Sequence, residues 1–194
     1  TATYPATVTA GHLLYGSATN VVSGLAMITK GSIPVGNGTV PAALAVGSNG
    51  AFPVADSGAT TGITWMLPGT ATVATAETTT SGVYTDLATS GPAVTKTIGA
   101  SGMALVTVSA KLENNTLGAF AIMSYGVTGA TTSAAADTRA LYINEAIAGS
   151  PVARMSFTKL HTGLTAGSNT FTAKYRVTAG TGTFTDRDII VLPL

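Results

Sequence analysis

The sequence predicts an all-β protein in two parts: an extended Gly/Pro-rich repeat segment over residues 1–70, and a jelly-roll-like antiparallel β-sandwich over residues 71–194. Three observations support this prediction. A six-residue motif occurs three times near the start, apolar and polar residues alternate with a period of two in the rest, and no stretch has the 3.6-residue period of a helix. The composition changes near residue 70, and we therefore expect the boundary between the parts there.

The motif consists of a glycine, a variable residue, three mostly apolar residues, and then glycine or alanine. Its copies are Gly11–Gly16, Gly31–Gly36 and Gly50–Ala55, and their starts lie 20 and 19 residues apart. Each copy leads into a turn of small polar residues, at 17–20, 37–39 and 56–58. A short apolar unit of this kind cannot bury its own face, so we expect it to stack on copies of itself or on other chains.

The first 70 residues contain two charged residues, Lys30 and Asp56, and five of the eight prolines. Proline lacks a backbone donor and fixes φ, which excludes long helices and disfavours long central strands. We therefore predict that the apolar triplets of the motif form brief strands, and that the extended segment makes its hydrogen bonds with neighbouring chains. Trp65 ends the repeat region, and we expect it to anchor the junction between the two parts; stacking on a sugar is the alternative.

The apolar side chains of the motif, together with Trp65, are the predicted packing residues of a stalk made from several copies of the chain. They are Leu13, Leu14, Tyr15, Ile33, Val35, Phe52, Val54 and Trp65. Strands with unpaired edges need partners, and a threefold arrangement of chains supplies them.

Eight segments after residue 70 read as strands separated by Gly/Asn-rich turns, which is typical of a β-sandwich. They are 83–87, 94–98, 104–112, 118–126, 139–144, 152–160, 170–177 and 182–192. The alternation predicts that Val106, Val108, Ala110 and Leu112 share one face of their strand. It predicts the same of Phe171, Ala173, Tyr175 and Val177, and the nearly apolar segment 118–126 reads as a strand buried on both sides.

The low charge of the chain favours assembly and excludes several function classes. Only 9% of residues are charged, against about 25% in an average globular chain. The net charge is +1 and the nine basic residues are scattered, so no stripe for a nucleic-acid backbone exists. Without cysteine there is no disulfide or thiolate metal site, and without a run of about 20 apolar residues we expect no membrane insertion.

The sequence predicts no catalytic residue, no cofactor and no metal site. A triad of His161, Asp186 and a serine lacks the Gly-x-Ser-x-Gly elbow. Asp186 and Asp188 lie two apart on a strand, but an isolated pair lacks the six to eight oxygens of a calcium site, and we expect it to cap a turn or bond a basic neighbour such as Arg176. We expect an ion pair between Asp137 and Arg139.

Two stretches of the repeat region resemble bacteriophage proteins. Residues 11–26, Gly-His-Leu-Leu-Tyr-Gly-Ser-Ala-Thr-Asn-Val-Val-Ser-Gly-Leu-Ala, resemble the repeated G-x-L-L-Y-G-S-A-x-N phrases of phage fibre proteins. Residues 46–65 resemble the G-x-x-G-x-x-L-x-A-D-S-x-x-x-x-G-x-x-W phrase of phage tail-fibre and minor tail proteins, with Phe-Pro-Val in place of a Gln-Val-Leu type of triplet. Residues 164–177 and 189–194 resemble the closing strands of jelly-roll heads on similar virion proteins. The resemblance covers roughly the first third and the last sixth of the chain.

The resemblance implies a non-enzymatic, trimeric phage surface protein with a β-rich stalk and β-sandwich heads, located on the virion. Its implied partners are other copies of itself, other virion proteins of the tail or capsid, and a host glycan or protein. Loops on a rigid sandwich carry recognition, so the candidate receptor contacts lie in segments 113–116, 128–138 and 163–169. They are Glu113, Asn114, Asn115, Thr116, Asp137 and Asn169.

Three alternatives to a fibre stay open. The first is a capsid decoration or cement protein, whose N-terminal arm would lie across the seams between coat proteins. The second is a polysaccharide-depolymerising module that uses Asp186 or Asp188. The third is a free polysaccharide-binding, lectin-like module.

Overall fold

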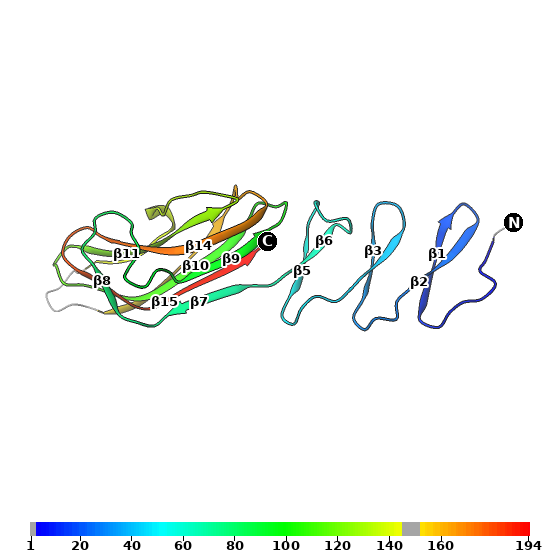
Figure 1. Cartoon of the computed structure of the whole chain (residues 1–194), viewed down its shortest axis with the longest axis horizontal. Coiled ribbons are helices and arrows are strands. Elements are labelled where there is room, and N and C mark those ends of the chain that lie inside the picture. Colours follow the sequence, from blue (N-terminus) through cyan, green and yellow to red (C-terminus); the bar gives the residue numbers. More distant parts are fainter. Residues whose placement is uncertain (1–2, 145–151) are drawn as a thin grey trace. The chain divides into compact units, whose positions relative to one another are not determined.

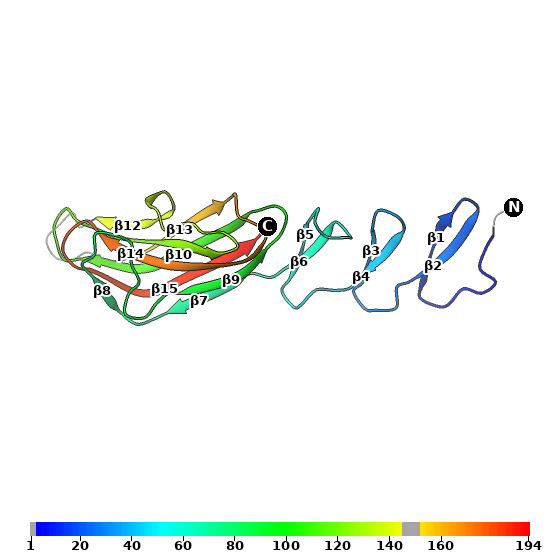
Figure 2. The same ribbon diagram turned by 45° about the horizontal axis from the view of Figure 1, so that its top comes forward.

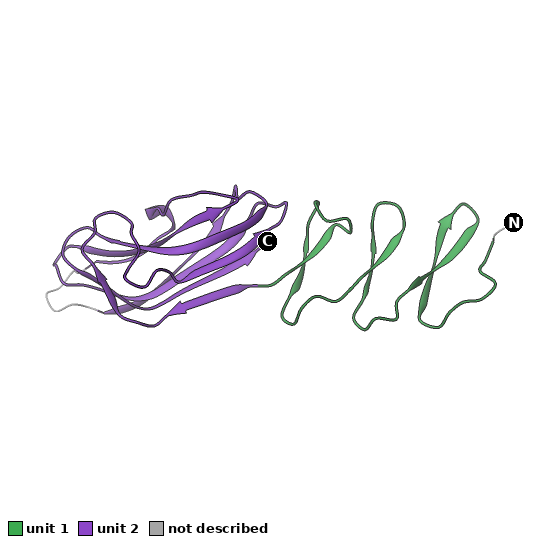
Figure 3. Ribbon diagram, viewed as in Figure 1, with its two compact units in different colours: residues 1–67 green, residues 68–194 purple. Residues whose placement is uncertain are grey.

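The computed structural model describes residues 3–144 and 152–194, and β-strands make up nearly all of the regular secondary structure of these residues (Figures 1 and 2). Its one helical element among these residues is a single 3-10 turn, η1 (Asp137–Arg139). The chain divides into two compact units, which we call the hairpin unit (Thr1–Leu67) and the sandwich unit (Pro68–Leu194) (Figure 3). No helix in the part of the chain that the structure describes is long and apolar enough to cross a membrane.

The hairpin unit contains three antiparallel two-stranded hairpins, and the first strand of each is one copy of the motif. The predicted brief strands are therefore confirmed. The expectation that this segment makes its hydrogen bonds with neighbouring chains is wrong for the motif strands, because each pairs with a return strand of the same chain. The hairpins are β1 (His12–Ala18) with β2 (Val21–Ala26), β3 (Ile33–Gly36) with β4 (Pro41–Leu44), and β5 (Phe52–Ala55) with β6 (Ile63–Met66).

The glycine that opens each motif copy is required by a tight turn. Gly11, Gly31 and Gly50 have φ of 81°, 80° and 82°. Among the described residues, Asn20 and Asp186 are the only non-glycine residues with positive φ. In each turn the N–H of the residue after the glycine donates to the carbonyl three residues earlier: His12 to Thr9, Ser32 to Thr29, and Ala51 to Ser48. Positive φ at the third residue alone defines a type II turn, which favours glycine there.

The small polar segments after the motif reverse the chain within each hairpin, as predicted. The Oδ1 atom of Asn37 accepts hydrogen bonds from the N–H groups of Thr39 (3.0 Å) and Val40 (2.8 Å). The Oδ1 atom of Asp56 accepts one from the N–H of Gly58 at 2.9 Å. Such side-chain bonds to the following backbone are the reason that Asn and Asp favour turns.

The sandwich unit is a jelly roll with one additional short strand. One sheet has the order β13-β10-β15-β7, with β8 also paired to β15, and the other has the order β12-β11-β14-β9. Without β8, the eight strands place the first beside the eighth and the second beside the seventh, which is the jelly-roll arrangement. The strands are β7 (Gly69–Val73), β8 (Glu77–Thr79), β9 (Ala93–Ile98), β10 (Ala104–Asn114), β11 (Phe120–Gly129), β12 (Leu141–Asn144), β13 (Ala153–His161), β14 (Gly167–Val177) and β15 (Gly182–Pro193).

Seven of the eight predicted strand segments coincide with observed strands, and one prediction is wrong. Segment 83–87 pairs with β14 only at Thr85, whose N–H and C=O bond to the backbone of Tyr175 at 3.0 and 2.9 Å. A single bridge does not extend into a ladder, although the sequence alternates there. Strands β7 and β8 were not predicted, because short runs of Gly, Thr and Ala give no apolar alternation.

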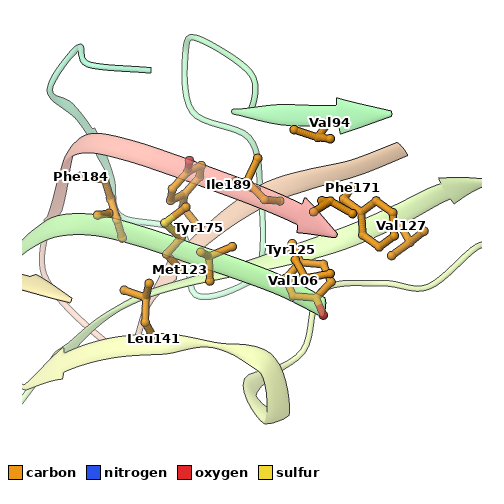
Figure 4. Packing of buried hydrophobic residues seen from close by; sticks show 14 of the residues in the cluster. Val94, Val106, Met123, Tyr125, Val127, Leu141, Phe171, Tyr175, Phe184 and Ile189 are labelled. Carbon is orange, nitrogen blue, oxygen red and sulfur yellow. The ribbon is translucent and has the colours of Figure 1, made fainter. Parts of the chain in front are cut away.

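The core lies between the two sheets, and its side chains come from the predicted faces (Figure 4). The four predicted residues of β10 and the four of β14 are at most 1% exposed, which confirms both faces. All residues from Ala121 to Val127 in β11 are buried, as expected of a strand covered on both sides. Its outer face lies under segment 131–140, where the Ser124 hydroxyl donates to the Ala136 carbonyl at 2.8 Å.

Candidate functional site

Six of the eight predicted stalk residues share one face of the hairpins. Residues two apart on a strand point to the same side, so the third and fifth positions of each motif copy lie together. Across each hairpin an apolar side chain from the return strand stands opposite the third position. We call this surface the motif face. Its residues are Leu13, Tyr15 and Leu25; Ile33, Val35 and Leu44; and Phe52, Val54 and Met66.

The motif face is only partly covered by the rest of the chain: two of its nine side chains are exposed, six are half-buried and one is buried. Among residues 3–67 only Met66 is buried, and no residue of this range belongs to the hydrophobic core cluster. Leu13 is 45% exposed and Ile33 is 40% exposed. An isolated two-stranded hairpin is at best marginally stable in water. The hairpins therefore need additional cover for their apolar side chains.

The three hairpins also repeat the same local packing around the turn glycine. An aliphatic side chain just after each return strand lies against that glycine, within 3.5 Å of where a Cβ atom would be. The pairs are Gly11 with Ile28, Gly31 with Val46, and Gly50 with Leu67. The sequence repeat is thus also a structural repeat.

Leu14 and Trp65 lie on the opposite face of their hairpins. The Nε1–H of Trp65 donates to the carbonyl of Ala45 at 2.8 Å, and its ring covers Gly47 so closely that a Cβ there would come within 2.6 Å. Trp65 therefore ties the third hairpin to the segment that leaves the second. The expectation that it anchors the junction with the sandwich is replaced by this contact between successive repeats.

The predicted receptor-contact loops lie at opposite ends of the sandwich unit. Segments 128–138 and 163–169 meet at one end, where β11 and β14 pair Gly129 with Asn169. Segment 113–116 lies at the other end, where the Oδ1 atom of Asn115 accepts the N–H of Thr181 at 2.8 Å. The loops do not form one surface, and Asp137 lies on the outer face of a sheet.

Asn114 and Asn169 are wrong as receptor contacts, because both side chains are fully buried. Asn114 accepts the N–H of Thr116 at 2.9 Å and donates to the carbonyl of Ala179 at 3.1 Å. Asn169 accepts the N–H of Thr131 at 2.8 Å and donates to two carbonyl groups of its own loop. Buried amides need such partners, and these two hold the loops in shape. Segment 113–116 keeps an exposed side chain at Asn115, with Glu113 and Thr116 half-buried.

Two predicted ion pairs have different partners in the structure. Asp188 binds Arg154 of β13 at 2.5 Å, and Asp186 lies 3.9 Å from the same guanidinium, so Arg154 and not Arg176 is their basic neighbour. Asp137 binds Arg176 at 2.6 Å and not Arg139. Arg139 instead donates to backbone carbonyls, among them that of Tyr125 at 3.1 Å.

The residues considered for catalysis do not come together. His161 stands opposite Ala104 on β10, whereas Asp186 lies beside Ala110, about 20 Å further along the strand at the usual rise per residue. The Nδ1 atom of His161 is 3.1 Å from the hydroxyl of Tyr125, and burial, with nearby cations, lowers the pKa of this imidazole. Among the described residues no three His, Asp or Glu side chains gather as metal ligands would.

A buried ion pair that the sequence did not reveal lies inside the sandwich. Arg187 is fully buried, its Nη2 donates to Glu77 at 2.9 Å, and its guanidinium lies 5.3 Å from the centre of the Tyr175 ring. A register shift between Ser109 and Lys111, opposite Asp186, makes a β-bulge. The extra residue changes which side chains of β15 face inward, so a charged residue enters the core.

Three solved structures of viral particles are similar to this chain, each with a TM-score below 0.5. No protein-family model and no curated protein matches the sequence. The crystal structure of the infectious bursal disease virus VP2 subviral particle is similar at 14% identity over 84% of this chain and 38% of that chain, with a TM-score of 0.44. T=1 particles derived from infectious bursal virus give 14% identity, coverages of 84% and 36%, and a TM-score of 0.41. The structure of the Gx strain of infectious bursal disease virus is similar at 10% identity over 82% of this chain and 37% of that chain, with a TM-score of 0.38. The chain spans less than two fifths of each of these chains, and likenesses at these scores assign no function.

Proposed function

We propose that this protein is a non-enzymatic structural component of a virus particle, a homotrimeric fibre whose sandwich unit serves host attachment. The hairpin units of three copies form the stalk, and the sandwich units form the heads. One observation carries the proposal: the chain builds the same apolar face three times in succession and leaves it only partly covered. Such a face is stabilised only when another molecule covers it.

Other copies of the chain are the occupant that best fits the motif face. The hairpins recur every 19 to 20 residues, so a second copy presents its faces at the same spacing and can meet all three in register. Burial of apolar surface contributes roughly 25 cal/mol per Å². Lys30 and Asp56 are the only Asp, Glu, Lys or Arg residues before residue 68, so little charge repulsion opposes close packing of identical chains.

The virion setting and the number of three copies are supported by the resemblance of residues 11–26 and 46–65 to phage fibre phrases. Each hairpin strand also has one outer edge; that of β2 bonds in part to Thr3, and neighbouring chains can pair along the others. The other implied partners are proteins of the tail or capsid, which would hold the stalk. A decoration protein on the capsid would use the same motif face against coat proteins.

The mass of the full chain in solution tests the assembly. Light scattering is expected to give three times the 19.2 kDa of one chain, whereas residues 68–194 alone are expected to have the mass of a single sandwich. Charges on the motif face, as in the triple variant Leu13→Asp, Ile33→Asp and Phe52→Asp, should separate the copies. The matched control Leu117→Asp places the same charge on an exposed leucine of the sandwich and should leave the trimer intact.

A full chain that stays monomeric in dilute solution would contradict the proposed stalk. Labelled antibodies on purified particles then test the location. Label on the tail supports a fibre, label over the icosahedral shell supports a decoration protein, and absence from particles refutes a virion role.

A further inference from the structure

Three aromatic side chains of the sandwich unit stand outside its core and gather on one sheet face. They are Tyr84, Phe120 and Tyr142. The other aromatic residues described in this unit either belong to the core cluster, as Tyr125, Phe171, Tyr175 and Phe184 do, or pack against it, as Phe157 does. In a chain with only 6% aromatic residues, this group of surface aromatic side chains distinguishes one sheet face from the rest of the sandwich surface.

Phe120 and Tyr142 form the apolar wall of a hollow on the outer face of the β12-β11-β14 sheet. Their rings meet edge to face, with centroids 5.6 Å apart. The hollow has a volume of about 310 Å³, at the lower end of the roughly 300–1,000 Å³ typical of small-ligand sites. Tyr142 is 56% exposed. We call this hollow the aromatic groove. The residues that line it are Phe120, Ile122, Asp137, Tyr142, Arg176 and Thr178.

The opposite wall of the aromatic groove is a bonded polar cluster. Asp137 accepts hydrogen bonds from the Tyr84 hydroxyl at 2.6 Å and from Arg176 at 2.6 and 3.2 Å, and the Arg176 guanidinium lies 5.3 Å from the centre of the Tyr84 ring. A carboxylate offers about four acceptor positions and a guanidinium five donors. The Asp137 side chain is 63% exposed and keeps acceptor positions for a ligand, whereas that of Arg176 is 18% exposed.

A second hollow adjoins this cluster on the same sheet face. It has a volume of about 320 Å³ and is lined by Tyr84, Thr172, Lys174 and segments 126–128 and 132–135. Tyr84 lines this hollow and bonds to Asp137 of the first, so a chain-like ligand can contact both. Lys174 is itself paired with Asp86 at 2.6 Å.

We propose that the aromatic groove and the adjoining hollow bind a neutral oligosaccharide of at least two sugar units. Asp137 balances Arg176, and Asp86 balances Lys174, so each charged side chain that lines the two hollows has a partner of opposite charge. A pyranose ring carries C–H groups on its faces and hydroxyl groups around its edge. The C–H faces suit the rings of Phe120 and Tyr142, and the hydroxyl groups suit the free acceptor positions of Asp137. As the attachment site of the head, the groove rests on the proposed function.

Binding of the full chain to immobilised neutral, sialylated and sulfated oligosaccharides tests the inference. We expect binding to one or more neutral glycans. Tyr142→Ala removes an exposed ring of the groove and should weaken that binding at least tenfold. Asp137→Asn keeps the shape but removes the ionised acceptor, and should weaken it severalfold. The matched control Leu117→Ala, which shortens an exposed side chain outside the groove, should leave binding unchanged.

Thermal unfolding of each variant shows whether the sandwich remains folded. The inference is overturned if the folded protein binds no neutral glycan, if it binds only acidic glycans, or if Tyr142→Ala leaves binding unchanged. Light scattering on the same samples separates this result from the proposed stalk. A trimer that binds no glycan would refute the glycan site and support the stalk. A monomer whose glycan binding depends on Tyr142 would support the glycan site and refute the stalk.

Discussion

The hairpin unit and the sandwich unit are both built from β-strands of small residues, but they differ in what covers the apolar side chains. In the sandwich, a second sheet covers each inner face, and 20 buried residues form one core cluster. In residues 3–67, one residue is buried and each strand has a single partner strand. Alternation alone therefore produces strands, whereas their stability requires a second layer. The sandwich supplies that layer from its own chain, and the hairpins must obtain it from elsewhere.

The largest expected effect tests whether the sandwich is stabilised from its own interior. Glu77→Ala leaves the guanidinium of Arg187 buried without its carboxylate, and breaking a buried ion pair in this way costs about 3–5 kcal/mol. Urea unfolding of the full chain, followed by the near-UV signal of the sandwich, measures this loss.

Glu113→Ala is the matched control, and as a substitution outside the core it should change the free energy of unfolding by less than about 0.5 kcal/mol. The double variant Glu77→Leu/Arg187→Met replaces both partners by apolar residues, and it should recover most of the free energy of unfolding that Glu77→Ala loses. If Glu77→Ala and Glu113→Ala prove equally stable, the buried ion pair contributes nothing to the stability of the sandwich.

The same substitution in the two units measures the difference between them directly. Leu112 is fully buried, and Leu112→Ala should destabilise the sandwich by about 2–5 kcal/mol. Leu13 is half exposed on the motif face, and Leu13→Ala should leave the unfolding of the sandwich unchanged. It should instead raise the protein concentration at which the trimer dissociates, as light scattering over a dilution series would reveal. Equal effects of both variants on the sandwich, with no effect of Leu13→Ala on mass, would contradict the comparison.

The sequence predicted the sandwich better than the hairpins because alternation is a local signal. The regular alternation of β10 and β14 identified their core faces at every position. On β15 the bulge at Asp186 changes the alternation, so Arg187 faces inward, and Thr-Asp-Arg-Asp gives no sign of this. The return strands of the hairpins were missed because their apolar residues, Leu25, Leu44 and Met66, recur at no fixed spacing from the motif glycine.

The candidate sites were predicted less well, because exposure depends on long-range contacts. Asn114 and Asn169 occur in turn-rich segments, yet each folds its amide inward to satisfy backbone groups distant in sequence. Phe120 and Tyr142 belong to different predicted strands, and only the pairing of β11 with β12 brings their rings together. Asp137 was predicted to pair with the nearby Arg139, whereas its partner Arg176 comes from β14.

A smaller effect is expected from the turn glycines of the hairpins. Gly31 has φ of 80° and a Cβ there would lie 3.2 Å from Val46, so Gly31→Ala should destabilise the turn by about 1–2 kcal/mol. Gly36 ends the same motif copy in open space, with nothing within 4 Å of an added Cβ, and Gly36→Ala is the matched control. Because the hairpins depend on assembly, we expect Gly31→Ala to weaken the trimer and to leave the sandwich unchanged. A trimer weakened equally by both variants would mean that the turn conformation is not the cause.

The smallest effect concerns acid. Hydrogen bonds from Arg176 and Tyr84 hold the pKa of Asp137 below its ordinary value, and those from Thr89, with Arg187 nearby, do the same for Glu77. A lowered folded pKa contributes stability that is complete above the ordinary values, which are about 4, and is lost as the pH falls through the folded values. Thermal unfolding between pH 7 and strongly acidic pH should therefore show the sandwich weakening below about pH 4, whereas the trimer mass at low temperature should persist.

Asp137→Asn should remove only a small part of the acid response, less than about 1 kcal/mol, because this ion pair is exposed to solvent. Asp56→Asn, the corresponding change in the hairpin unit, should leave the acid response of the sandwich as it was. If acid dissociated the trimer before it weakened the sandwich, the stalk would depend on carboxylates that its sequence almost entirely lacks, and an apolar motif face would not explain its assembly.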